Sequence, residues 1–132
     1  MSGMTDLQQM LEHLTVKRRD GEFVYLVVPS LEEGAKHDPA ALIVEDEGIT
    51  AVVPRAVADR AGLAYDYVAT WLTLEVHSAL EAVGLTAAFS KALGDQGISC
   101  NVIAAYHHDH LLVPSHRTDD AVRALEGLRH SD

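Results

Sequence analysis

The order of hydrophobic patterns in the second half of the chain constrains the fold most. Residues 68–76 alternate between apolar and polar side chains, as a half-buried strand does. Residues 85–97 carry apolar side chains at helical spacing, and two apolar runs at 98–106 and 110–114 precede a last helical pattern. This order of strand, helix, strand, strand and helix makes up most of a β-α-β-β-α-β unit that lacks only its final strand.

The first half also predicts an incomplete unit. Its patterns indicate a helix at 5–14, a strand at 22–29, a loop at 30–39 and a hairpin of two strands around Glu47-Gly48, after which Pro54 opens a short helix. The fourth strand that each half needs can come from the other half. We therefore expect an α+β protein of two ferredoxin-like units, with antiparallel sheets and helices on one face, that share or exchange strands.

No segment has the composition and length of a linker, so we expect the two halves to pack together. The best boundary lies at Tyr65–Tyr67, which predicts an N-terminal domain at 1–64 and a C-terminal domain at 65–132. The only basic cluster, Lys17 to Arg19, is followed by acidic residues, and we expect it to be a solvated turn.

Composition narrows the partners and the compartment. The 132 residues carry a formal net charge of -10, which repels phosphate backbones and argues against nucleic acid as a partner. The single cysteine, Cys100, suits a reducing cytoplasm and is predicted to be a small buried hydrophobe. No apolar stretch approaches the roughly 20 residues of a membrane span, and the N-terminus lacks a signal-peptide pattern. We expect a cytoplasmic protein that neither spans nor binds a membrane.

Three segments of the second half, "TLEVHSALEAVGLTAA", "GISCNVIAAY" and "HHDHLLVP", resemble the ACT domain, in the version found in a family of small, uncharacterised bacterial proteins with tandem ACT domains. The first half, with "GITAVVP", is compatible with that family. The resemblance implies ACT-type units. ACT domains bind amino acids and other small effectors, commonly between two ACT units, and often dimerise by continuing a sheet or packing helices.

The resemblance also implies a ligand site, because in ACT domains the loop after the first strand and the start of the next helix approach the ligand. The predicted ligand-binding residues are His77, Ser78, Glu81, Val83, Gly84, Leu85, Thr86 and Asn101. Gly84 has no Cβ, so its backbone can come close to a ligand, and the N–H groups that follow suit a carboxylate. Glu75, Glu81 or Asn101 would accept from an ammonium group. Each of these residues also has a purely structural explanation as part of a turn, a helix start or a strand.

The second candidate site is the cluster His107, His108, Asp109 and His110, at the turn between two predicted strands. In an extended chain His108 and His110 share a face and, with His77 or His116, offer donors for Zn²⁺ or Ni²⁺. Against a metal, neighbouring side chains point apart, and Asp is common in turns. A third hypothesis is a pH-responsive hairpin tip, since close histidines repel one another when charged.

The resemblance to ACT domains, without an accompanying catalytic motif, implies a regulatory sensor with no catalytic residues and no cofactor. Its predicted partners are a small metabolite such as an amino acid, a second copy in a homodimer, and an unidentified protein that receives the signal. One alternative is a metal-dependent enzyme that uses the His107–His110 cluster, perhaps with Glu75, although no established hydrolase or phosphate-loop motif is present. The other is a structural module that only forms homo-oligomers.

Overall fold

The computed structural model of the chain describes residues 3–76 and 84–130, with side chains from residue 7 onward. It divides into two compact units: unit 1 comprises residues 1–19 and 71–132, and unit 2 comprises residues 20–70. Packing therefore groups the N-terminal segment with the C-terminal half. The expected domain boundary at residues 64 and 65 stays a prediction, and the packing units differ from it.

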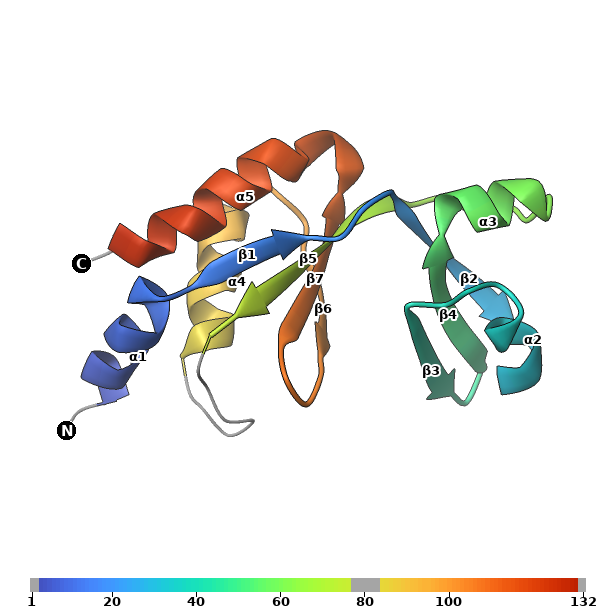
Figure 1. Ribbon diagram of the computed structural model, residues 1–132, viewed down its shortest axis with the longest axis horizontal. Coiled ribbons are helices and arrows are strands. Elements are labelled where there is room, and N and C mark those ends of the chain that lie inside the picture. Colours follow the sequence, from blue (N-terminus) through green and yellow to red (C-terminus); the bar gives the residue numbers. More distant parts are fainter. Residues whose placement is uncertain (1–2, 77–83, 131–132) are drawn as a thin grey trace. The chain divides into compact units, whose positions relative to one another are not determined.

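Unit 2 is a complete β-α-β-β-α-β unit (Figure 1). Its elements are β2 (Phe23–Val28), α2 (Leu31–Ala35), β3 (Ala41–Glu45), β4 (Gly48–Pro54), α3 (Arg55–Arg60) and the first residues of β5 (Val68–Glu75). The strands lie in the order β3-β4-β2-β5, and all three pairings are antiparallel.

Unit 1 has the same layout but starts in the middle of the chain. It runs from the later residues of β5 through α4 (Leu85–Asp95), β6 (Asn101–Ala104), β7 (Asp109–Pro114) and α5 (Thr118–Glu126), with short 3₁₀ turns at Ser115–Arg117 and Gly127–His130. The N-terminal α1 (Gly3–Glu12) and β1 (Thr15–Arg18) complete it. Its strand order is β1-β5-β7-β6.

Strand β5 serves both units. Its residues Val68 and Ala69 pair with β2 of unit 2, whereas its residues from Leu72 to Glu75 pair with β1 of unit 1. The prediction of two ferredoxin-like units that share strands is therefore confirmed. Unit 1 obtains its fourth strand, β1, from outside its C-terminal stretch, whereas the fourth strand of unit 2 is the start of β5, which then continues into unit 1.

Two local predictions are wrong. Lys17 and Arg18 belong to strand β1 and not to a solvated turn. The prediction missed this strand because it is short and its charged side chains remain exposed at the sheet edge. The predicted loop at 30–39 contains helix α2, whose start is capped by Ser30, since the hydroxyl of that residue accepts from the Glu33 N–H at 3.1 Å.

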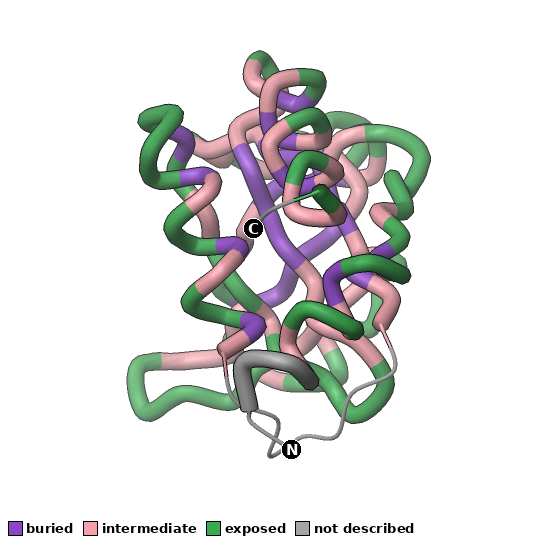
Figure 2. The backbone as a smooth tube through the Cα atoms, turned by 90° about the vertical axis from the view of Figure 1, so that its left-hand side faces the viewer, coloured by how far each residue is buried: buried purple, intermediate pink, exposed green. Residues whose placement is uncertain are grey.

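Each unit has its own hydrophobic core. In unit 1 one side of α4 is buried, with Leu85, Phe89 and Leu93 against Leu72 and Leu74 of β5. Buried positions recur along the helices between exposed ones, as an amphipathic helix requires (Figure 2). The side chains that alternate with Leu72 and Leu74 along β5 point to the other face of the sheet. That face carries the polar groups of the candidate site.

Among the helices of the described ranges 3–76 and 84–130, none combines the length and the apolar content needed to cross a bilayer.

Candidate functional site

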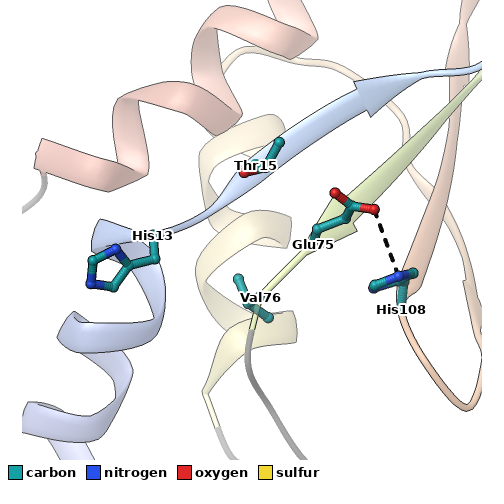
Figure 3. Close-up of a pocket in the computed structure, with 5 residues that line it drawn as sticks. All are labelled: His13, Thr15, Glu75, Val76 and His108. Carbon is teal, nitrogen blue, oxygen red and sulfur yellow. Dashed lines mark ion pairs between the residues drawn. The ribbon is translucent and has the colours of Figure 1, made fainter.

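A pocket of about 660 Å³ lies within unit 1 (Figure 3). Its lining residues are His13, Thr15, Glu75, Val76 and His108. The volume falls in the range of small-molecule sites, roughly 300–1,000 Å³. We refer to it as the Glu75 pocket.

Three neighbouring segments place these side chains. Glu75 ends β5, and because successive side chains of a strand alternate, it points away from the core residue Leu74. Thr15 begins β1 directly opposite Glu75 in the antiparallel pair, so the two side chains share a face. His13 lies in the link between α1 and β1, and His108 lies in the turn that leads into β7 (Figure 3).

The pocket is lined by one carboxylate and two imidazoles. The Oε2 atom of Glu75 lies 3.4 Å from Lys17 Nζ and 3.7 Å from His108 Nε2. The other ring nitrogen of His108, Nδ1, is buried without a hydrogen-bond partner among the described residues. Such an arrangement can accept a cationic group at Glu75 and donate to an anionic group from an imidazole N–H.

His110 lies beside the pocket on the same face. Its Nδ1 atom is 2.9 Å from Thr73 Oγ1 and 3.2 Å from Trp71 Nε1. Burial of the ring lowers the pKa of His110 from 6.5, and the charges of His108 and Arg19 act in the same direction, whereas Asp109 opposes them. The neutral form of His110 is thus favoured.

Half of the predicted ligand-binding set lies outside the described residues, namely His77, Ser78, Glu81 and Val83. Gly84 precedes α4 with φ 102°, and a Cβ at that position would lie 3.1 Å from Leu7 Cδ2. Because Gly84 has no Cβ, the side chain of Leu7 from the N-terminal helix can pack beside it. Leu85 is buried in the core of unit 1.

The two other described members of the predicted set, Thr86 and Asn101, are exposed. None of the described members of this eight-residue set lines the Glu75 pocket, although Glu75, which was predicted separately as an ammonium acceptor, does. The predicted ligand set stays a prediction, and the pocket is a separate candidate beside it.

The structure brings His108 and His110 together but places His116 elsewhere. His108 and His110 contact each other edge to face, with 6.4 Å between ring centroids, as their shared face predicts. His116 lines a different pocket of about 370 Å³, beside the start of α5. Within residues 3–76 and 84–130, no three His, Cys, Asp or Glu side chains are grouped so that they could hold a metal ion. The metal alternative based on His108 and His110 stays a prediction.

Cys100 does not have the character of a nucleophile. It is half-buried against the core of unit 1, and this burial raises the pKa of its thiol to about 11. Since the thiolate is the reactive form, very little of it is present at neutral pH.

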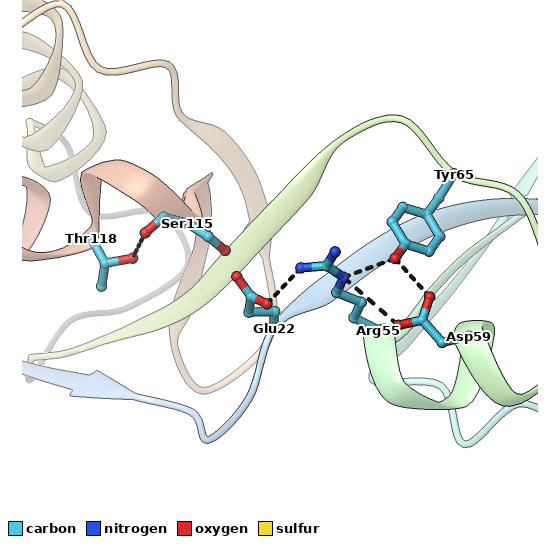
Figure 4. A network of polar contacts seen from close by, with 6 residues as sticks. All are labelled: Glu22, Arg55, Asp59, Tyr65, Ser115 and Thr118. Carbon is cyan, nitrogen blue, oxygen red and sulfur yellow. Dashed lines mark hydrogen bonds and ion pairs between the residues drawn. The ribbon is translucent and has the colours of Figure 1, made fainter.

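Unit 2 holds a polar network that is satisfied internally (Figure 4). Arg55 donates from Nη1 to Glu22 Oε1 at 2.9 Å and from Nε to the Tyr65 hydroxyl at 2.8 Å. That hydroxyl donates to Asp59 Oδ1 at 2.7 Å. Since these charges satisfy one another, the network serves to anchor α3, and we assign it no ligand.

The sequence pointed to part of the Glu75 pocket. It named Glu75 as an acceptor for an ammonium group and His108 as a candidate site residue, but it missed His13, Thr15 and Val76. The missed signal is the alternation in Thr15-Val16-Lys17, where only Val16 packs against the core. The four residues of β1 are too few for that alternation to identify a strand without its partner strand.

Comparison with known proteins identifies the family. Family models described as ACT domain match residues 2–70 and residues 67–127. A Vibrio cholerae protein of unknown function, described as a possible transport protein, is 38% identical, with a TM-score of 0.88 over 97% of this chain and 99% of that one. No curated protein matches the sequence significantly.

More distant structures share the fold. An Agrobacterium tumefaciens protein is 16% identical, with a TM-score of 0.61 over 88% of this chain and 89% of its own. The ligand-free regulatory subunit of aspartate kinase from Thermus thermophilus is 9% identical, with a TM-score of 0.56 over 87% of this chain and 95% of its own. From the two family matches and the 38% identical relative, the chain belongs to the ACT-domain family and carries two ACT domains in tandem.

Proposed function

We propose that the protein is a regulatory sensor that binds a small metabolite in the Glu75 pocket and has no catalytic activity of its own. The observation that carries the proposal is a pocket of about 660 Å³, inside an ACT unit, that brings one carboxylate and two imidazoles together. The fold shared with a regulatory subunit of aspartate kinase supports a regulatory role but names no ligand.

The polar groups favour a ligand with an ammonium and a carboxylate group, as in an α-amino acid. Glu75 would accept from the ammonium group, in competition with Lys17 at 3.4 Å. An imidazole N–H of His13 or His108 and the Thr15 hydroxyl would donate to the carboxylate. The aliphatic side chain of Val76 would contact a small apolar part of the ligand.

Regulation would follow from a difference in affinity between two states of the protein. A ligand shifts such an equilibrium only by the difference between its binding free energies for the two states. A homodimer, or a cytoplasmic protein partner that recognises one state, would provide the second state. Light scattering of the protein with and without the ligand would test the homodimer.

A thermal-shift screen of the proteinogenic amino acids and the nucleobases tests the proposal directly. A ligand that binds only the folded state stabilises it by about 2.7 kcal/mol at 100 times its Kd, so we expect at least one amino acid to raise the Tm. Glu75→Gln keeps the shape of the side chain but removes its charge, and we expect it to weaken binding of that amino acid roughly tenfold.

The matched control is Glu126→Gln, at the end of α5 and outside the pocket lining, which should bind like the wild type. If no compound raises the Tm of the folded protein, the structural-module alternative is favoured. If Glu75→Gln binds as tightly as Glu126→Gln, the ligand binds elsewhere.

A further inference from the structure

Lys17 lies at the edge of the Glu75 pocket, with its ammonium group next to the carboxylate of the pocket. In β1 it comes two residues after Thr15, so both side chains share the face of the sheet that carries Glu75. Lys17 is paired with Thr73 across the strands and is a diagonal neighbour of Glu75, a separation that a long side chain can bridge. Its Nζ atom lies 3.4 Å from Glu75 Oε2.

The ion pair between Lys17 and Glu75 is easily broken. The side chain of Lys17 is 67% exposed and that of Glu75 is 30% exposed. An ion pair that solvent reaches in this way is weak, because water screens both charges and the lysine side chain loses rotamer freedom when it is held in place. The ammonium group of Lys17 can therefore leave Glu75 when the ammonium group of a ligand arrives, and it stays within reach of the bound ligand.

The pocket and its edge offer more donors than acceptors. The donors among the described residues there are His13, Thr15, Lys17 and His108. Glu75 is the only carboxylate among these described residues. A complementary ligand therefore carries more anionic groups than cationic ones.

Asp109 does not change this balance. It lies two residues before Leu111 in β7, and Leu111 is buried in the core of unit 1. Since side chains two residues apart in a strand share a face, Asp109 points to the face that packs against the helices, whereas Glu75 points to the other face.

An amino acid with two carboxylates and one ammonium group complements these donors and the one acceptor. Its ammonium group would bind Glu75, and its α-carboxylate would accept from the Thr15 hydroxyl and an imidazole N–H. Its second carboxylate would meet the ammonium group of Lys17 that the ligand has displaced. A ligand with two cationic groups fits poorly, because the described lining holds no second carboxylate and Lys17 repels the added charge.

We propose that Lys17 determines the specificity of the Glu75 pocket, which selects amino acids with a carboxylate in the side chain and disfavours those with a second cationic group. This inference rests on the proposed function, because it requires that an amino acid binds at Glu75. In the ligand-free protein Lys17 occupies the place of the ligand ammonium group, and in the complex it pairs with the side-chain carboxylate of the ligand.

NMR chemical-shift titration with two isosteric pairs of amino acids tests this specificity. L-glutamate and L-glutamine differ in the negative charge of the side chain, and L-arginine and L-citrulline differ in its positive charge. We expect the wild type to bind glutamate about fivefold more tightly than glutamine, and citrulline about fivefold more tightly than arginine. Lys17→Gln should reduce both ratios to about twofold or less, and Lys17→Glu should reverse the order within each pair.

The matched control is Lys91→Gln. Lys91 also belongs to unit 1, its side chain is 76% exposed, and it pairs with Asp95 at 2.7 Å, so this variant loses the same charge from a comparable ion pair outside the pocket lining. It should keep both ratios of the wild type. Equal affinities within each pair for the wild type, or ratios that Lys17→Gln leaves unchanged, would overturn the proposal.

Glu75→Gln separates this proposal from the proposed function. If Glu75→Gln weakens the binding of amino acids but Lys17→Gln leaves the ratios unchanged, the pocket is the site and only the role of Lys17 is wrong. If none of the four amino acids binds to the wild type, the role of Lys17 is also wrong, and the thermal-shift screen alone decides on the proposed function.

Discussion

Replacing Phe89 with alanine is expected to lower the free energy of unfolding by about 3–5 kcal/mol. Phe89 lies in the middle of α4, is completely buried, and packs in the core that joins α4 to β5 and β7. The truncation removes apolar surface from the core and leaves a cavity that rigid neighbours fill only in part. Because small domains are stable by only about 5–15 kcal/mol, this is a large share of the total.

Urea unfolding followed by circular dichroism measures the loss, and Tyr106→Ala is the matched control. Tyr106 is also aromatic and lies in unit 1, but 78% of its surface is exposed, so its truncation should change stability by at most about 0.5 kcal/mol. If Phe89→Ala and Tyr106→Ala lower the free energy of unfolding by the same amount, the core of unit 1 is not packed around α4 as described.

The second large effect is expected at Gly48, where Gly48→Ala should destabilise the protein by about 1–3 kcal/mol. Gly48 begins β4 and pairs with Glu45 across the β3–β4 hairpin. Its φ of 148° is one that L-residues rarely adopt. An added Cβ would also lie 3.1 Å from Val27 Cγ1, so a neighbouring side chain has to move.

The same substitution at Gly94 is the control for Gly48, with the opposite expected sign. Gly94 lies inside α4 in ordinary helical geometry, and a Cβ there would meet no atom within 4 Å. Gly94→Ala should therefore stabilise the protein by about 0.5–1 kcal/mol, because alanine restricts the unfolded chain and favours a helix. Destabilisation of similar size by both changes would show that the loss at Gly48 does not come from its backbone conformation.

The local pattern predicted most of the elements because their signals repeat over enough residues. In α4, apolar positions at helical spacing identified the buried residues Leu85, Phe89 and Leu93. The hairpin at β3 and β4 was confirmed, although its turn lies at residues 46–47, one position earlier than expected. Helix α2 was missed, because five residues with a glycine among them, Gly34, resemble a loop.

Less of the candidate site was predictable. Glu75 stood out as a possible acceptor for an ammonium group, and His108 as one of three histidines within four positions. That they meet at 3.7 Å depends on β5 and β7 lying side by side in the sheet of unit 1. Similarly, Gly84 suggested close approach of a ligand, whereas in the structure Leu7 occupies the space beside it. A glycine in the sequence indicates that another group approaches the backbone closely, but it does not identify whether that group is a ligand or a side chain of the protein.

The sequence by itself determined the class of fold, since hydrophobic periodicity and turn residues are local properties that each segment carries with it. It also determined the family, through short segments near β5, β6 and β7. Only the tertiary structure decided that β1 completes unit 1 and that β5 serves both units, because a strand's partner is chosen by pairing between distant segments. The Glu75 pocket follows from those pairings: His13 and Thr15 line it together with Glu75 only when β1 lies against β5.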